Sequence, residues 1–166
     1  MARFQIHDRL RIDAHTLGRF QLCHLLLHKN AVLPWFILVP ETDAADLLDL
    51  PEDLRNSAVN EAAFVSDFIK GTLGYPKTNF ASIGNVVPQL HLHVVGRRAD
   101  DPCWPAPVWG NLHQMQKYST PELRRFTGLL GRYPTFKVAC DDNKRGNSNS
   151  VRSLQRLNSA AKPERP

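Results

Sequence analysis

Two histidines stand two positions apart in the apolar stretch QLHLHVV, residues 89–95. On a β-strand, residues two apart share a face, so Gln89, His91 and His93 point one way while the leucines between them point into the core. Paired imidazoles can bind or attack a phosphate, because a neutral imidazole is a good nucleophile near pH 7. Attack through one ring nitrogen requires the other to hold the proton, and a backbone carbonyl that accepts this N–H would fix the tautomer.

The same pattern has two simpler interpretations. Alternating apolar and polar residues are typical of any half-exposed edge strand, and short histidine motifs also occur by chance. Alternate histidines on a strand can ligate zinc as well, but zinc needs a third protein ligand, and no Cys, Asp or Glu stands at an obvious companion spacing. We therefore expect no metal site and no cofactor.

Four strands and a long helix are predicted around this stretch. Residues 20–27, FQLCHLLL, and 35–40, WFILVP, are predicted to form a hairpin. Beyond Pro51, apolar residues recur every three or four positions, which predicts a long helix that ends before Gly74. Residues 78–84 and the histidine stretch then predict two adjacent strands. This order is typical of the α+β class, in which helices pack on an antiparallel sheet.

A second helix and a tail are predicted at the C-terminal end. Ser119 and Glu122 form a capping box, with Pro121 in the first turn, ahead of the helical stretch PELRRFTGLL. Residues 141–166 are polar and poor in aromatics, so they cannot bury enough apolar surface to offset the entropy of ordering. We predict a globular domain over residues 1–140 and a disordered tail over residues 141–166.

Composition excludes several classes of protein. The chain has 166 residues, 42% of them hydrophobic, which suits one compact domain. The net charge is +5, but Lys and Arg are scattered, so we predict no specific nucleic-acid partner. The longest apolar run, AVLPWFILVP, is too short to span a bilayer, so the protein should be soluble. Three cysteines without a CxxC pair favour a reducing cytoplasm over a disulfide framework.

The segment GNVVPQLHLHVVGRR resembles the signature of the histidine triad (HIT) superfamily, His-φ-His-φ-His-φφ after a short glycine-led turn, where φ is apolar. It is most similar to the bacterial branch, in which the motif begins with Gln and continues into a segment like WPAPVWG. The likeness covers residues 4–110. It implies a five-stranded antiparallel half-barrel with a long helix and a C-terminal helix packed against it, commonly paired into a homodimer. It also implies a nucleotide substrate, either a dinucleoside polyphosphate or a nucleoside phosphoramidate.

The resemblance assigns roles to the motif residues. His91 takes the central position and would attack the α-phosphorus, giving a nucleotidyl-histidine that water resolves. The backbone carbonyl of Gln89 would accept the other N–H of His91, so the exchange of the first His for Gln leaves the nucleophile oriented. His93 would donate to a non-bridging oxygen or to the departing group.

The resemblance also suggests supporting residues. Asn79 and Asn85 stand where relatives place amides that touch phosphates, although asparagine in either place can instead serve turn chemistry. Asn30 stands near the position that holds the ribose hydroxyls. Val86 occupies a position that carries a hydroxyl in many relatives. Arg97 and Arg98 are expected either to attract a polyphosphate or to be solvated at the strand end.

Three classes of function therefore remain in view. The first is a nucleotide hydrolase or nucleotidyl transferase. The second is a nucleotide-binding or interaction module that kept the pocket and lost fast chemistry, suggested by Gln89 and Val86. The third is a metal-dependent protein, which stoichiometric zinc would identify.

Overall fold

The computed structural model describes residues 4–139, so the predicted tail, residues 141–166, lies outside the described residues. Within the described range, six strands form one antiparallel sheet in the order β4-β5-β3-β2-β1-β6. The strands are β1 Ala14–Arg19, β2 Cys23–His28, β3 Trp35–Pro40, β4 Lys77–Ser82, β5 Leu92–Arg97 and β6 Lys137–Val138. The helices are α1 Asp8–Asp13, α2 Glu52–Gly71 and α3 Thr120–Leu130, with a short 3-10 helix, η1, at Leu47–Asp49.

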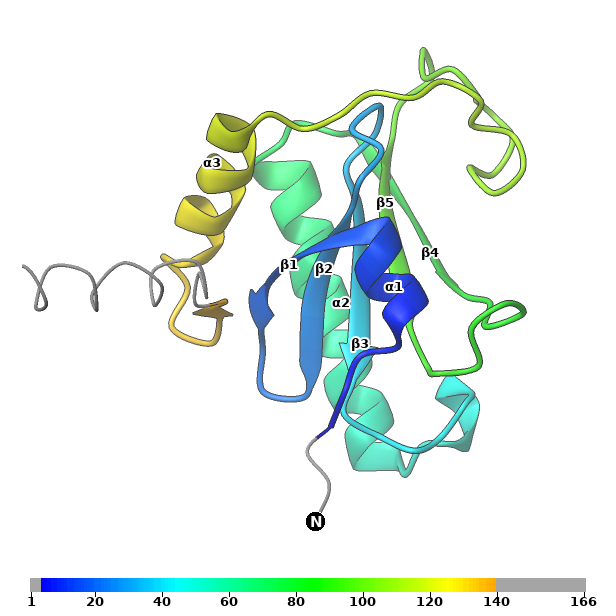
Figure 1. The fold of residues 1–166 in the computed structure, drawn as a ribbon, viewed down its shortest axis with the longest axis vertical. Helices are drawn as coiled ribbons and strands as arrows, with labels where there is room; N and C mark the ends of the chain where they lie inside the picture. The colour runs from blue at the N-terminus through cyan, green and yellow to red at the C-terminus, as the bar shows by residue number, and fades with distance from the viewer. Residues whose placement is uncertain (1–3, 140–166) are drawn as a thin grey trace, which may run out of the picture.

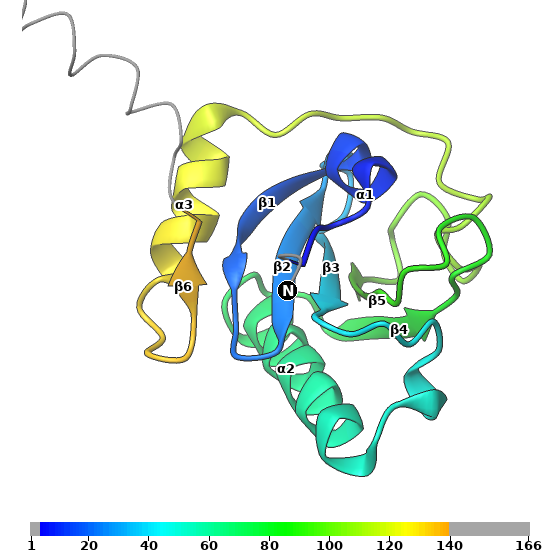
Figure 2. The same cartoon turned by 60° about the horizontal axis from the view of Figure 1, so that its bottom comes forward.

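Helices cover both faces of the sheet. α2 runs along one face, and α1 lies against the other, while α3 lies beside β1 and β6 (Figures 1 and 2). The predicted α+β class and the antiparallel sheet are confirmed. The sheet has one more strand than the five expected, because Lys137 and Val138, which follow α3, pair with Arg19 and Gly18 of β1.

α2 forms because its apolar residues return to one face at helical spacing. Its buried residues are Ala58, Ala62, Val65, Phe68 and Ile69. Acidic residues in its first turn face the positive end of the helix dipole. The predicted long helix is therefore confirmed, and it ends at Gly71, before the left-handed Gly74. Among the described residues, no helix is both long and apolar enough to cross a membrane.

The predicted hairpin is present, with a shifted start. β2 pairs with β3 in antiparallel register, but β2 begins at Cys23 rather than at Phe20. The preceding residues turn instead, because the Glu61 carboxylate on α2 accepts the backbone N–H groups of Leu22 and Cys23, at 2.9 and 2.8 Å. β1 and α1, which precede this turn, were not predicted.

β5 lies inside the sheet, between β3 and β4, and is buried on both faces. Leu90, Leu92 and Val94 enter the core against α2, as the alternation predicts. The strand itself begins at Leu92, so the residues from Gln89 to His91 approach it without belonging to its ladder.

The capping box before α3 is present as predicted. The Ser119 side chain accepts the backbone N–H of Glu122, and the Glu122 carboxylate accepts the backbone N–H of Ser119 at 2.7 Å. From β5 the chain reaches α3 through a long connection that crosses the end of the sheet (Figure 1). This connection carries Trp109, which bears on the site below.

Candidate active site

His91 and His93 line the same pocket, which has a volume of about 250 Å³. Each residue is only 7% exposed, and their ring centroids are 4.8 Å apart. The predicted arrangement of two neighbouring imidazoles is therefore present, with His93 in β5 and His91 immediately before it. The other walls come from α1, β2, β3, the turn before the histidines and the connection after β5; they include Arg9, Leu10, Asp13, His28, Trp35, Ile37, Asn85, Val87 and Trp109.

The orientation of His91 follows from one hydrogen bond. Its Nδ1 lies 2.7 Å from the carbonyl oxygen of Gln89. A carbonyl oxygen can only accept, so Nδ1 carries the proton and donates it. The neutral ring therefore keeps its lone pair on Nε2, as a nucleophile requires.

His93 is held in the opposite tautomer. The indole N–H of Trp35 donates to Nδ1 of His93 at 2.9 Å, and an indole nitrogen has no acceptor capacity. Neutral His93 therefore carries its proton on Nε2. Burial, followed by the neighbouring His91 and His28 rings, lowers the pKa of His93 from 6.5 to about 3, so the ring is neutral near pH 7. The pocket thus holds one imidazole with a free lone pair and one with a free N–H donor.

The side chain of Gln89 does not face the pocket as a free amide. Its Oε1 accepts the backbone N–H of His7 at 2.8 Å, and its Nε2 donates to the carbonyl of Gln5 at 2.9 Å. These bonds tie the start of the motif to the segment that leads into α1. Gln89 therefore contributes its carbonyl to His91 and its side chain to the N-terminal segment.

The turn before the histidines brings one predicted substrate-binding residue to the pocket. Asn85 lines it, together with Gly84, which has the left-handed φ of 69°. Val86 lies at the rim and is 84% exposed. Because residue 86 is a valine, it offers no hydroxyl group to a ligand in the pocket.

Asn30 lies outside the pocket. Its side chain is buried, its Nδ2 donates to the carbonyl of Gln114 at 2.8 Å, and its Oδ1 accepts the backbone N–H groups of Val32 and Gln116. These bonds fasten the loop before β3 to the connection that precedes α3. The expected contact of Asn30 with ribose hydroxyls is corrected accordingly, because the amide already serves the protein backbone.

The side chains of Asn79 and Arg97 are hydrogen-bonded to each other rather than directed to the pocket. Asn79 Oδ1 accepts from Nη1 of Arg97 at 2.6 Å, and Arg97 is 1% exposed. Arg97 further donates to the Asp101 carboxylate and to the carbonyl of Ala106. The Arg97 side chain is neither solvated at the strand end nor placed in the pocket to attract a polyphosphate, so neither expectation for it holds. Asn79 does not line the pocket either.

An aromatic wall completes the pocket. The His28 ring stacks on Trp35 with centroids 4.4 Å apart and planes at 17°. Trp109 meets the rings of Trp35 and His93 edge-on, at 5.5 and 5.2 Å. Sequence reasoning missed Trp35 as a site residue, because a tryptophan in an apolar strand is typical of core packing.

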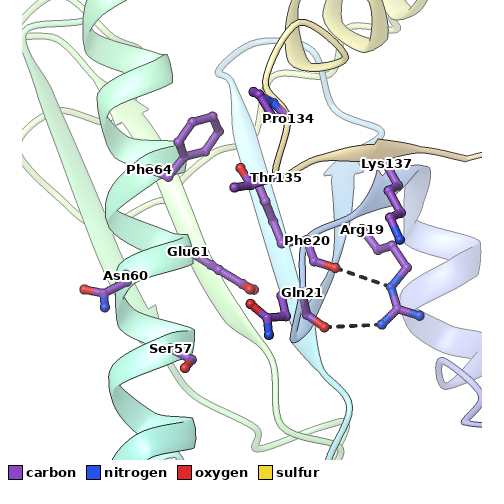
Figure 3. A pocket seen from close by; sticks show the side chains of 10 residues that line it. All are labelled: Arg19, Phe20, Gln21, Ser57, Asn60, Glu61, Phe64, Pro134, Thr135 and Lys137. Atoms are coloured by element: carbon purple, nitrogen blue, oxygen red, sulfur yellow. Dashed lines mark hydrogen bonds between the residues drawn. The ribbon is translucent and has the colours of Figure 1, made fainter.

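Two larger cavities lie elsewhere. One of about 800 Å³ is bounded by α2, the β1–β2 turn and residues 134–137 (Figure 3). Its carboxylate, Glu61, is occupied by backbone N–H groups, and its Arg19 donates to the carbonyls of Phe20 and Gln21. The other, of about 790 Å³, lies between β1 and α3. The smaller pocket is the better candidate, because it alone of the three is lined by both His91 and His93, whose tautomers are set by hydrogen bonds. Over residues 4–139, no three His, Cys, Asp or Glu side chains are grouped to hold a metal ion.

Comparison with known proteins agrees with this geometry. The family profile of the HIT domain matches residues 9–100. A histidine triad protein from Marinobacter aquaeolei VT8 is 36% identical, with a TM-score of 0.73 over 79% of this chain and 96% of that one. One from Bradyrhizobium japonicum is also 36% identical, with a TM-score of 0.72 over 77% and 96%. One from Sinorhizobium meliloti 1021 is 34% identical, with a TM-score of 0.71 over 75% and 93%. No curated protein matches the chain significantly.

Proposed function

The chain belongs to the HIT domain family, and from this premise we propose that it is a nucleotide hydrolase or nucleotidyl transferase. It cleaves at the α-phosphate of a nucleoside phosphate conjugate, either a dinucleoside polyphosphate or a nucleoside phosphoramidate. The observation that carries the proposal is the pair of opposite tautomers in one pocket. A lone pair on His91 and an N–H on His93 are the groups that attack at a phosphate requires.

The proposed reaction has two steps. In the first, Nε2 of His91 forms a bond to the α-phosphorus while the bond from phosphorus to the leaving group breaks and its electron pair departs with that group. A phosphoramidate nitrogen also takes up a proton from the solvent, so that it departs as the neutral amine. The ring becomes positively charged, and the Gln89 carbonyl stabilises it through the Nδ1–H bond. In the second step, a water oxygen bonds to phosphorus, the phosphorus–nitrogen bond breaks, and a proton from the water passes to the solvent.

The remaining walls suit a nucleoside. Leu10, Ile37 and Val87 supply apolar surface, and Trp35 and Trp109 supply aromatic surface. Ligand pockets of this kind combine mostly apolar walls with a few directed polar groups. We propose that Asn85, at the turn, donates to a phosphate oxygen.

Turnover and a trapped intermediate would test the proposal. The protein is incubated with diadenosine tetraphosphate and with an adenosine phosphoramidate, and AMP release is compared with that of His91→Ala. Acid-sensitive nucleotidyl adducts are sought by mass spectrometry on the peptide that contains residue 91. No release above the variant from either substrate would overturn the proposal.

A nucleotide-binding module is the second candidate. It is favoured by the position of the Gln89 side chain, which is bonded to the N-terminal segment and offers no cation to a leaving group. Calorimetric titration with AMP or GMP separates the two candidates, because binding without turnover of either substrate identifies the module.

We also propose a homodimer, as the family resemblance implies. β4 is an edge strand, and Phe80 within it and Ile83 directly after it are 48% and 38% exposed. Open strand edges with exposed apolar side chains are suited to pairing with another chain. Analytical ultracentrifugation should give twice the chain mass of 18.8 kDa, and Phe80→Glu should shift the protein to the monomer.

A further inference from the structure

We propose that Trp35 is a positioning residue, which holds His93 as a fixed hydrogen-bond donor that stabilises developing charge without giving up its proton. The inference rests on the proposed function of the site and deepens it. It concerns how His93 stabilises the leaving group, by hydrogen-bond donation or by proton transfer. The alternative is that His93 acts as a general acid and transfers a proton to the leaving group.

The bond from Trp35 to His93 is buried and held from several sides. Trp35 is 8% exposed and His93 is 7% exposed. Trp35 pairs with Val95 across β3 and β5, and Ile37 pairs with His93 in the same register, so the two backbones are locked in the sheet. The Trp35 ring is further fixed by the His28 ring stacked on it and the Trp109 ring against its edge. The indole therefore cannot easily turn its N–H away from Nδ1.

The position of this N–H decides what His93 can do. A second proton on the ring would have to go to Nδ1, where the Trp35 N–H already points. Two donors would then face each other in a buried place, and the hydrogen bond would be lost. A neutral ring that gave away its Nε2 proton would become an imidazolate, a much stronger base than a departing phosphate or phenolate. The proton therefore stays on Nε2, and the ring acts as a neutral electrophile.

The charged and titratable groups around the ring support this state. His91 and His28 are imidazoles whose presence disfavours a charge on His93, and burial acts in the same direction. From α1, Asp13 and Arg9 line the same pocket, but they pair with each other at 2.8 Å. Among residues 4–139, no acidic group is hydrogen-bonded to His93 to favour its charged form.

Nuclear magnetic resonance of ring nitrogens tests the tautomer directly. In the wild type, two-bond ¹H–¹⁵N correlations should show His93 protonated at Nε2 only, from pH 5 to pH 8. Trp35→Phe removes the donor and keeps an aromatic ring, and should give a mixture of both tautomers. Trp109→Phe is the matched control, since Trp109 touches His93 only through its ring, and it should leave the His93 tautomer unchanged. A wild-type ring protonated at Nδ1 would overturn the inference, whether or not Trp35→Phe folds.

Kinetics test the consequence for the reaction. With AMP esters of phenols as substrates, the wild-type kcat/KM should fall at least about 100-fold from p-nitrophenol to phenol, because no proton transfer rescues the poorer leaving group. Trp35→Phe should lower kcat roughly tenfold with little change in KM, since part of the population presents no donor. In a His93→Ala background, the same change should alter kcat less than about twofold. A nearly constant kcat/KM along the series, or a full effect of Trp35→Phe without His93, contradicts the inference. If no ester is turned over, the proposed function fails, and the resonance experiment alone decides the role of Trp35.

Discussion

Arg97 and Asp101 form an ion pair inside the protein, with Nε of Arg97 2.7 Å from Oδ2 of Asp101 and side chains 1% and 0% exposed. Burial by itself would raise the pKa of Asp101, but hydrogen bonds from Arg97 and from the backbone of Arg98 and Cys103 outweigh it and lower that pKa. Because Arg97 also reaches the carbonyl of Ala106, the pair fastens the connection that carries Trp109 to the sheet.

The first prediction concerns this pair. Asp101→Ala leaves the Arg97 charge buried without a partner, which should lower the free energy of unfolding by about 3–5 kcal/mol in urea denaturation. Arg9 and Asp13 provide the control, since they have the same i,i+4 spacing but are 63% and 43% exposed. Asp13→Ala should cost less than about 1 kcal/mol. Equal decreases in the free energy of unfolding of the two variants would contradict the claim that burial determines the contribution of the pair.

The second prediction concerns pH and stability. The folded state keeps His93 neutral with a pKa of about 3, while an unfolded histidine takes up a proton near pH 6.5. The unfolded state therefore binds more protons below pH 6.5, and the free energy of unfolding should fall by about 1.4 kcal/mol for each pH unit between roughly pH 6 and pH 4. Urea denaturation of the wild type and of His93→Gln over this range isolates the contribution of His93. The same pH dependence in both proteins would contradict the assignment.

The third prediction concerns the Gln89 side chain. Gln89→Ala removes two hydrogen bonds to the N-terminal segment, at about 1 kcal/mol each, and keeps the carbonyl that orients His91. Hydrogen exchange of residues 5–13 should become faster, and KM should rise more than kcat falls. A loss of kcat as large as that of His91→Ala would instead place the Gln89 amide in the reaction itself.

The fourth prediction compares two glycines. A Cβ at Gly96 would lie 2.6 Å from Pro34 and 2.8 Å from Ile69, so Gly96→Ala should lower the melting temperature by several degrees. A Cβ at Gly128, inside α3, meets nothing within 4 Å. Gly128→Ala should therefore stabilise the protein by about 0.5–1 kcal/mol through helix propensity. Calorimetry of both variants measures the two effects, and similar shifts would contradict the packing at Gly96.

Local sequence patterns predicted the elements that depend on local physics. The repeat of apolar residues identified α2, and the pairing of Ser119 with Glu122 identified the start of α3. Alternation around His91 and His93 correctly predicted which side chains enter the core and which face the pocket. These features need only neighbours within a few residues along the chain.

Features that depend on distant partners could not be predicted in this way. The turn before Cys23 is fixed by hydrogen bonds to Glu61, which lies on α2. The Asn30 amide is hydrogen-bonded to the backbone of Gln114 and Gln116. An asparagine that binds a ligand and one that ties two loops look alike in a sequence. The tautomer of His93 likewise depends on a tryptophan 58 positions away.

Cys103 places a thiol next to the buried ion pair that fastens the connection to the sheet. Cys103 is 7% exposed and lies beside the Arg97 and Asp101 side chains, within the connection that carries Trp109. Burial and the neighbouring carboxylate raise its pKa, so alkylation in the closed state should be slow. The rate of iodoacetamide modification at this thiol, resolved from Cys23 and Cys140 by peptide mass spectrometry, would therefore report how readily this part of the connection becomes exposed to solvent. A change in that rate on adding a nucleotide would show that a ligand in the pocket alters the exposure of this connection.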